Sequence, residues 1–199
     1  MRTVFSTAPR WVIASHNAGK IKEIEDLVRP RGIAVSGAGE AGLPEPDETE
    51  TSFAGNALLK ARAAAEVSGM VSLADDSGLS VDALGGAPGV YSARWAGRPR
   101  DFGRAMARVH DELAGGEDRT ARFVCVLALA APDGTTVTYE GQVEGEIVWP
   151  PRGEGGFGYD PIFVPKGETR TFAEMTPGEK RGLSHRGRAF EALIADVFS

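Results

Sequence analysis

Three carboxylates stand where the chain is expected to leave regular structure. Glu48 lies in the acidic run EPDETE, and Asp75 and Asp76 follow the apolar residues 71–74. Carboxylate oxygens are hard ligands, and Mg²⁺ is typically held by one or two of them together with phosphate oxygens and water. The three side chains are therefore candidates for a magnesium site. An ordinary turn at DDSG and a solvated loop at EPDETE are the alternatives.

A candidate phosphate-binding loop, SHNAGK, spans residues 15–20. It follows the apolar run WVIAS and precedes IKEIEDLV, whose apolar residues recur at helical spacing. A helix N-terminus offers unpaired N–H groups and the positive end of a dipole, and Lys20 adds a full charge. The loop is not a Walker A motif, because its spacing differs and no Ser or Thr follows Lys20. A helix cap with a solvated lysine is the alternative.

Two later segments carry side chains suited to a nucleobase. Residues 155–160, GGFGYD, place two aromatic rings and a carboxylate among glycines, which suits base stacking close to the backbone. A rigid hairpin turn is the alternative reading. Lys180, His185 and Arg186 put three hydrogen-bond donors within seven residues, just ahead of the last expected helix. Such donors would suit an oxygen-rich ligand edge.

The apolar pattern predicts an α/β protein that positions these residues. Strands are expected at 11–15, 32–36 and 71–74, and helices after the first loop and at 52–69, 101–114 and 186–198. The runs 120–131 and 135–148 flank Pro-Asp-Gly, a turn signal that predicts a long antiparallel hairpin. Strand–helix units together with a hairpin indicate a mixed sheet rather than a purely parallel one.

Length and charge exclude several classes of protein. The 199 residues, 42% of them hydrophobic, suit one compact domain, which we place at residues 11–199 after an N-terminal extension at 1–10. A formal net charge of -6 argues against a nucleic-acid partner. The longest apolar run, residues 123–131, is too short to span a membrane, and its single cysteine, Cys125, is expected to be a buried thiol. The first ten residues lack a secretory signal, so a cytoplasmic location is expected.

Six segments, taken in order, resemble the inosine triphosphate pyrophosphatase family, whose members are also called dITP/XTP pyrophosphatases. They are SHNAGK, TSFAGNALLKA, ADDSGLSVDALGGAPGVYSAR, ARFVCVLAL, GGFGYDPIF and EKRGLSHRGRA. The resemblance implies an elongated two-lobed α/β fold with a central mixed sheet, an active-site cleft between the lobes, and usually a homodimer. It also implies Mg²⁺-dependent hydrolysis, with Mn²⁺ as a substitute, of ITP, dITP, XTP and dXTP to the monophosphate and pyrophosphate, which removes non-standard purines from the nucleotide pool.

The same resemblance implies roles for individual residues. The triphosphate would be held by Ser15, His16, Asn17, Ala18, Gly19, Lys20 and Lys60. The metal would be held by Glu48 and Asp76, with Asp76 also the proton acceptor, and Ser77 would contact substrate. The base would be enclosed by Phe157, Gly158, Tyr159 and Asp160, and its oxygenated edge recognised by Lys180, His185 and Arg186.

Two positions depart from the family pattern. Gly55 stands where members often carry an acidic residue, and His16 replaces a commoner small residue. We expect these differences to tune metal affinity or rate rather than abolish activity. That expectation would fail if a glutamate at position 55 were needed for any turnover.

Base selectivity is expected to follow from hydrogen-bond polarity. Hypoxanthine and xanthine present an oxygen at position 6 that can accept hydrogen bonds from donors such as Arg186, His185 or Lys180. Adenine presents an amino group there, which would leave buried donors unpaired. The residue that rejects the 2-amino group of guanine is not identified by the sequence. The competing interpretations are a related pyrophosphatase for modified pyrimidine or methylated nucleotides, and a nucleotide sensor without turnover.

Overall fold

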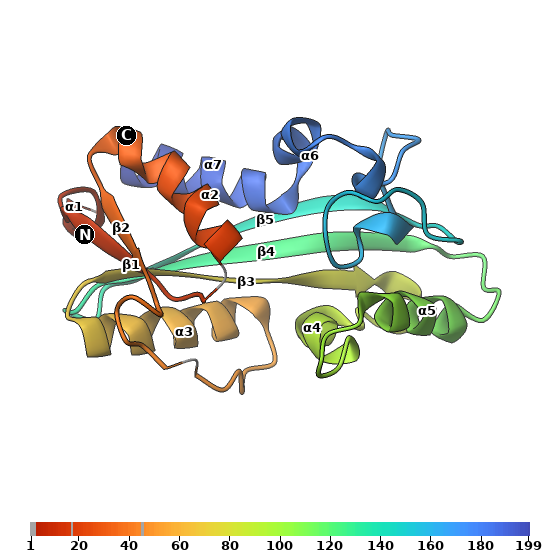
Figure 1. Cartoon of the computed structure of the whole chain (residues 1–199), viewed down its shortest axis with the longest axis horizontal. Helices are drawn as coiled ribbons and strands as arrows, with labels where there is room; N and C mark the ends of the chain where they lie inside the picture. Colours follow the sequence, from red (N-terminus) through yellow and green to blue (C-terminus); the bar gives the residue numbers. More distant parts are fainter. Residues whose placement is uncertain (1–2, 17, 45) are drawn as a thin grey trace. The chain divides into compact units, whose positions relative to one another are not determined.

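The computed structural model describes residues 3–16, 18–44 and 46–199. Figure 1 traces the chain through one sheet with the strand order β2-β1-β3-β4-β5-β6. The strands are β1 (Arg10–Ile13), β2 (Ala34–Gly37), β3 (Val71–Val81), β4 (Thr120–Ala130), β5 (Thr136–Ile147) and β6 (Phe163–Pro165). The helices are α1 (Thr3–Ser6), α2 (Ala18–Val28), α3 (Phe53–Ser68), α4 (Ser92–Trp95), α5 (Phe102–Leu113), α6 (Pro177–Leu183) and α7 (His185–Val197).

The predicted α/β class with a mixed sheet is confirmed. β1 is parallel to both β2 and β3, whereas β6 is antiparallel to β5. β4 and β5 are neighbours joined by the turn at residues 131–135, in which the Thr135 N–H donates to Asp133 Oδ1 at 2.8 Å. This is the hairpin that the Pro-Asp-Gly signal predicted.

The chain forms two compact units. Unit 1 comprises Met1–Asp76, Val126–Tyr139 and Phe190–Ser199, and unit 2 comprises Ser77–Cys125 and Glu140–Ala189. In the part of the chain that the structure describes, no helix is both long and apolar enough to cross a bilayer. Cys125 is fully buried, as expected.

In unit 1 two strand–helix–strand crossovers share β1 as their centre. The chain passes from β1 through α2 to β2, and then through α3 to β3 on the other side of β1. Because such crossovers are right-handed, two that run in opposite directions place their helices on opposite faces of the sheet. Figure 1 shows α2 and α3 on opposite sides of β1. Before β1, Phe5 of α1 is buried and its carbonyl accepts a hydrogen bond from Trp11 Nε1 at 3.1 Å.

Local sequence explains where α3 begins and ends. The Ser52 side chain accepts a hydrogen bond from the Gly55 N–H at 3.0 Å, and Gly69 ends the helix with a φ of 65°. Small alanines line the buried face of the helix and allow close packing. Ser72 of β3 is fully buried and donates to the Ala61 carbonyl at 2.6 Å, which ties α3 to the strand.

Unit 2 is built around an aromatic core. Phe163 packs against Phe123 and Phe172 with ring centroids 4.6 and 5.4 Å apart. α5 begins at the predicted position, where Asp101 accepts a hydrogen bond from the Arg104 N–H at 3.1 Å. The apolar face of α5 joins the same core.

Two differences from the sequence prediction concern candidate site residues. The strand expected to end at Ala74 continues through Asp75–Gly78 to Val81, so the two aspartates lie within β3 rather than in a turn. The pairing of β3 with β1 ends at Leu73, so the strand beyond Ala74 is supported by its other neighbour, β4, and this pairing outweighs the turn preference of Asp-Asp-Ser-Gly. In addition, α7 begins at His185, one residue before the predicted start at Arg186, so both residues belong to its first turn.

Candidate active site

The first group of candidate residues lies in unit 1, at the carboxyl end of β1 and at the level of β3 where its parallel pairing with β1 ends. Ile13 of β1 pairs with Leu73 of β3, so the residues just after Ile13 are level with Asp75 and Asp76. The chain leaves β1 toward β2 on one side and later returns to β3 on the other side. In α/β sheets this topological switch point is where ligands bind.

The loop after β1 has the predicted strand–loop–helix arrangement. The Ser15 carbonyl accepts a hydrogen bond from the Ala38 N–H at 3.2 Å, and the His16 side chain is exposed. Asn17 lies outside the described residues, as do the side chains of the three residues that begin α2, Ala18, Gly19 and Lys20. The assignment of this loop to the triphosphate stays a prediction.

Lys60 joins the two predicted metal-binding carboxylates. Its Nζ lies 2.6 Å from Glu48 Oε1 and 3.4 Å from Asp76 Oδ1. The three side chains come from the acidic loop, α3 and β3, and residues far apart in sequence are thus brought together as predicted. Asn56, one helical turn before Lys60, donates from Nδ2 to Asp76 Oδ2 at 3.3 Å.

Burial gives this group unusual acid–base properties. Asp76 is only 7% exposed. Its burial, with a smaller contribution from the like charge of Glu48, raises its pKa to about 6 against the opposing effects of Lys60 and Asn56. Burial lowers the pKa of Lys60, but Asp76 and Glu48 offset that effect and the pKa is raised overall. A carboxyl group with a pKa near neutrality can accept a proton more effectively than an ordinary aspartate.

The site suits a hard divalent cation. Two carboxylates face one position that already carries a cationic group, the Lys60 ammonium. Within residues 3–16, 18–44 and 46–199 there is no group of three or more His, Cys, Asp or Glu side chains that could hold a metal. Two carboxylates are a donor set that would suit Mg²⁺, which needs only one or two when phosphate and water complete its shell.

Gly55 has a structural explanation. A Cβ atom at this position would lie 2.8 Å from Glu50 Cβ and 3.0 Å from Ser52 Oγ. The space beside the first turn of α3 is thus filled by Glu50, and a side chain at position 55 would collide with it.

The second group of candidate residues lies in unit 2 and centres on Asp160. Asp160 is 2% exposed, its Oδ2 accepts a hydrogen bond from the Phe157 N–H at 2.7 Å, and it forms an ion pair with Lys180. A Cβ on Gly156, whose φ is 69°, would clash with the same Oδ2. Glycine is therefore required at this position for two separate reasons.

Phe157 presents an open aromatic face beside two cations. Its side chain is 60% exposed, and Lys180 Nζ and Arg186 Cζ lie 4.5 and 5.8 Å from its ring centroid. His185 and Arg186 are both buried, and the His185 ring stacks on Phe123 at 5.0 Å. An exposed ring flanked by donors is suited to a planar ligand with oxygens at its edge.

Tyr159, Gly158 and Ser77 occupy different surroundings. Tyr159 is 3% exposed, its hydroxyl donates to the Ser92 carbonyl at 2.8 Å, and burial raises its pKa. Its ring belongs to the core of unit 2, so a contact with substrate would fall to its backbone. Gly158 has a φ of 67°, and Ser77 is the partly buried residue after Asp76 in β3.

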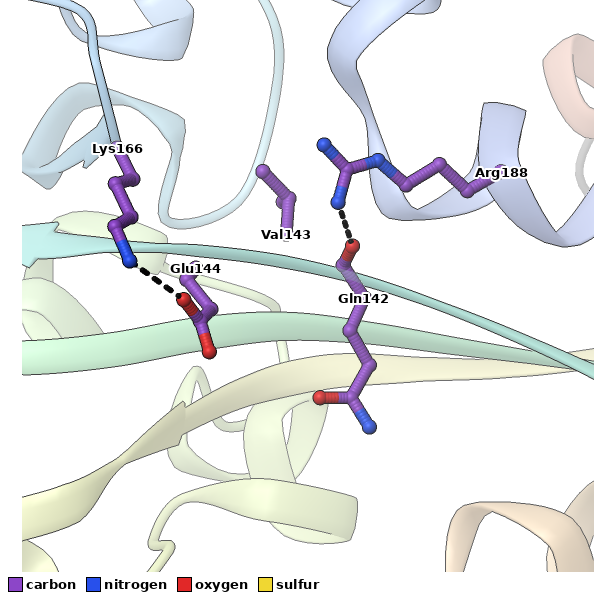
Figure 2. Close-up of a pocket in the computed structure, with 5 residues that line it drawn as sticks. All are labelled: Gln142, Val143, Glu144, Lys166 and Arg188. Atoms are coloured by element: carbon purple, nitrogen blue, oxygen red, sulfur yellow. Dashed lines mark hydrogen bonds and ion pairs between the residues drawn. The ribbon is translucent and has the colours of Figure 1, made fainter.

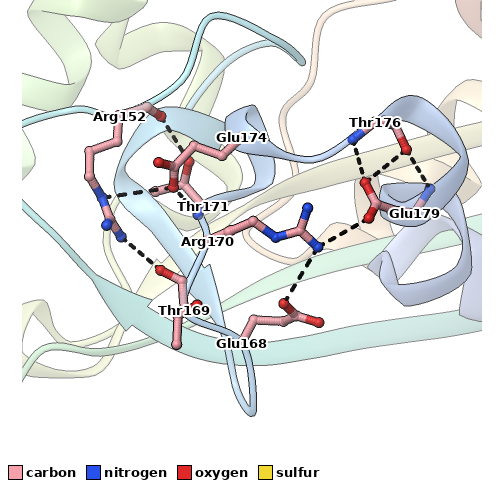
Figure 3. A network of polar contacts seen from close by, with 8 residues as sticks. All are labelled: Arg152, Glu168, Thr169, Arg170, Thr171, Glu174, Thr176 and Glu179. Carbon is pink, nitrogen blue, oxygen red and sulfur yellow. Dashed lines mark hydrogen bonds and ion pairs between the residues drawn. The ribbon is translucent and has the colours of Figure 1, made fainter.

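A polar network supports α6, the helix that carries Lys180 (Figure 3). Thr176 and Glu179 form a reciprocal capping box at its start, and Arg170 Nη2 donates to Glu179 Oε1 at 3.1 Å. A second capping box pairs Thr171 with Glu174. The two capping boxes therefore fix the backbone of residues 171–179, which lead up to Lys180.

A separate surface hollow of about 330 Å³ contains none of the predicted residues (Figure 2). It is lined by Gln142, Val143, Glu144, Lys166 and Arg188. Lys166 lies 3.3 Å from Glu144, and Arg188 donates to the Gln142 carbonyl at 2.6 Å, so both cations already have partners.

Two residues of these groups were missed at the sequence level. Asn56 precedes Lys60 by four residues on the same helix, a spacing that places both on one face and is a usable signal. Phe123, beneath His185, comes from β4, and no local pattern links the two.

Comparison with known proteins covers nearly the whole chain. The sequence model of the Ham1 family matches residues 11–196. A dITP/XTP pyrophosphatase of Gluconobacter oxydans is 54% identical, covering 98% of this chain and 93% of the relative. One from Caulobacter vibrioides is 57% identical, covering 95% and 98%. The solved structure of a HAM1 protein from Coxiella burnetii has a TM-score of 0.91 and 41% identity, covering 95% of this chain and 98% of that one.

These matches confirm the resemblance that the six ordered segments suggested, at an identity well above what a shared fold alone would require. The chain belongs to the Ham1 family.

Proposed function

We propose that this protein is a dITP/XTP pyrophosphatase that hydrolyses dITP, ITP, XTP and dXTP between the α- and β-phosphates. The products are the nucleoside monophosphate and pyrophosphate, and the role is removal of non-standard purines from the nucleotide pool. The observation that carries the proposal is the Glu48–Lys60–Asp76 group beside the carboxyl end of β1, in which Asp76 is buried and the other two side chains are partly buried. The names of the family relatives support it.

Asp76 is the proton acceptor in this proposal. A pKa raised to about 6 leaves it mostly ionised at neutral pH and gives it more basicity than a solvated aspartate. It can orient the attacking water and take its proton. Lys60, already placed against both carboxylates, neutralises charge that develops on the departing pyrophosphate.

Glu48 and Asp76 are the residues that would hold Mg²⁺. When bound, the cation neutralises negative charge on the phosphate oxygens of the substrate. The loop at 15–20 adds N–H groups at the start of α2 for the same oxygens.

The base is assigned to the unit 2 group. Phe157 offers its exposed face for stacking, and Lys180, His185 and Arg186 supply donors to the 6-oxygen. Asp160 holds Lys180 by an ion pair and Phe157 by a backbone hydrogen bond, so one carboxylate orients the stacking ring and a donor together.

A substrate panel tests the function. We expect kcat/KM for dITP and XTP to exceed that for dATP by about 10⁴-fold, because adenine would leave buried donors unpaired. Comparable turnover of dATP would contradict the assignment of the base site. Preferential turnover of modified pyrimidine or methylated nucleotides would favour the related pyrophosphatases instead.

A nucleotide sensor is the alternative from a different class. It would bind dITP without releasing any product, with or without Mg²⁺. The names of the family relatives, which are dITP/XTP pyrophosphatases, favour the enzyme. The homodimer and the cytoplasmic location remain predictions.

A further inference from the structure

Asn56 uses both ends of its side-chain amide within unit 1. Its Oδ1 accepts a hydrogen bond from the Glu50 N–H at 3.0 Å, and its Nδ2 donates to Asp76 Oδ2 at 3.3 Å. Glu50 lies two residues after Glu48 in the acidic loop. One side chain therefore links the backbone of the loop that carries the first carboxylate to the second carboxylate itself.

The amide of Asn56 supplies both an acceptor and a donor, which the two bonds require. The Glu50 N–H needs an acceptor, whereas ionised Asp76 needs a donor, and an aspartate or an alanine at position 56 would fail at least one of them. Asn56 is 1% exposed, so water cannot replace a lost partner without cost.

Asn56 and Lys60 act on the same two segments in different ways. They lie four residues apart on one face of α3, and both contact Asp76. Lys60 bonds the two carboxylates through a charge that competes with any arriving cation. Asn56 is neutral and bonds the loop through its backbone, so its contacts are compatible with a cation at the carboxylates.

We propose that Asn56 is a positioning residue that fixes the Glu48 loop against Asp76 and so sets the two carboxylates for a divalent cation before the cation arrives. The inference rests on the proposed function only in assigning a cation to these carboxylates. Asn56 does not touch the substrate in this account.

Mn²⁺ alone, titrated into the protein without nucleotide and followed by electron paramagnetic resonance, provides the direct readout. We expect Asn56→Ala to weaken Mn²⁺ binding by about 10- to 100-fold, the usual effect of removing a residue that orients a metal ligand. The Mg²⁺ concentration for half-maximal dITP hydrolysis should rise in parallel, while kcat at saturating Mg²⁺ falls much less.

Ser72→Ala is the matched control. It also removes a buried hydrogen bond between β3 and α3 in unit 1, but Ser72 does not contact the carboxylates. We expect Ser72→Ala to lower stability without changing Mn²⁺ affinity. Equal weakening in both variants would overturn the inference, because it would show a general effect of loosening α3.

A second pair of variants leaves Asn56 in place and serves if Asn56→Ala does not fold. Glu50 lies at an exposed loop position. Glu50→Pro removes the backbone N–H that donates a hydrogen bond to Asn56 Oδ1, whereas Glu50→Ala keeps it. We expect Glu50→Pro to weaken Mn²⁺ binding by about 2- to 10-fold, the range for one hydrogen bond, and Glu50→Ala to leave it unchanged.

The outcomes separate this inference from the proposed function. If the wild type hydrolyses dITP but Asn56→Ala and Glu50→Pro bind Mn²⁺ as tightly as the wild type does, the inference alone is overturned. If the wild type does not bind Mn²⁺ in the absence of nucleotide, the inference about Asn56 is overturned as well. The proposed function is then still tested by dITP hydrolysis. Absence of dITP turnover with intact, Asn56-dependent Mn²⁺ binding would contradict the function alone.

Discussion

At Asp76 the demands of stability and of the proposed function conflict. This side chain is buried against Glu48, and its pKa of about 6 lies well above that of an unfolded aspartate. Between about pH 4 and pH 6 the folded state holds a proton that the unfolded state has lost, so stability falls as the pH rises through this window. Since one pKa unit corresponds to about 1.4 kcal/mol, the ionised side chain costs up to about 3 kcal/mol at neutral pH.

Asp76→Asn should therefore lower turnover by orders of magnitude without lowering stability. In EDTA, we expect the variant to be more stable than the wild type at pH 7.5 by up to about 3 kcal/mol, and the advantage to shrink toward pH 4.5. Urea unfolding at the two pH values measures the difference. A variant less stable than the wild type at pH 7.5 would mean that Lys60 and Asn56 outweigh the burial of Asp76.

Gly156 leaves the space that the Asp160 carboxylate occupies in the proposed base site. Gly156→Ala would place a methyl group against the Asp160 carboxylate and disturb both Phe157 and Lys180. We expect KM for dITP to rise roughly tenfold, the cost of about one hydrogen bond to a charged group. Gly167→Ala is the control, because Gly167 has a φ of 88° but nothing within 4 Å of the added atom. An equal rise in KM for both variants would show that backbone strain alone explains the effect.

At the scale of elements, the acidic loop packs closely against the first turn of α3, and this is possible because position 55 has no side chain. Alanine normally favours a helix over glycine by about 1 kcal/mol, but here it would meet Glu50 Cβ at 2.8 Å. We expect Gly55→Ala to destabilise the protein in the natural background and to stabilise it in the Glu50→Gly background. Unfolding free energies of the four proteins in this double-mutant cycle give the coupling. Stabilisation in both backgrounds would refute the proposed steric contact.

The start of α6 depends on Glu179. Its pKa is lowered to about 2 by the Thr176 N–H, by Arg170 and by the Thr176 hydroxyl. A lowered pKa contributes stability that is present above the unfolded value and is lost as the pH falls toward 2. We expect Glu179→Gln to be less stable than the wild type at pH 7 and to lose less stability between pH 5 and pH 3. Glu66→Gln, on the exposed face of α3, should keep the wild-type acid sensitivity.

For the whole molecule, the sequence predicted what depends on local pattern. The Ser52 and Asp101 caps, the Pro-Asp-Gly hairpin and the loop after β1 all lie where capping, turn and periodicity rules place them. These features involve residues within a few positions of one another, so a single sequence contains the information.

What the sequence did not predict depends on contacts between distant segments. β3 extends past Asp75, beyond the end of its pairing with β1 at Leu73, because the distant strand β4 lies beside it in the sheet, and no local rule anticipates that. The Asn56–Asp76 bond and the His185–Phe123 stack join residues from different elements. The family resemblance located the site residues, whereas the reason for Gly55 emerged only from the position of Glu50.

The most direct test of the central claim is the identity of the products from dITP. Wild-type protein with Mg²⁺ should release one pyrophosphate for each dIMP and no orthophosphate, and Asp76→Asn should release neither at a comparable rate. Orthophosphate with dIDP as the main products would place the cleaved bond between the β- and γ-phosphates and contradict the account.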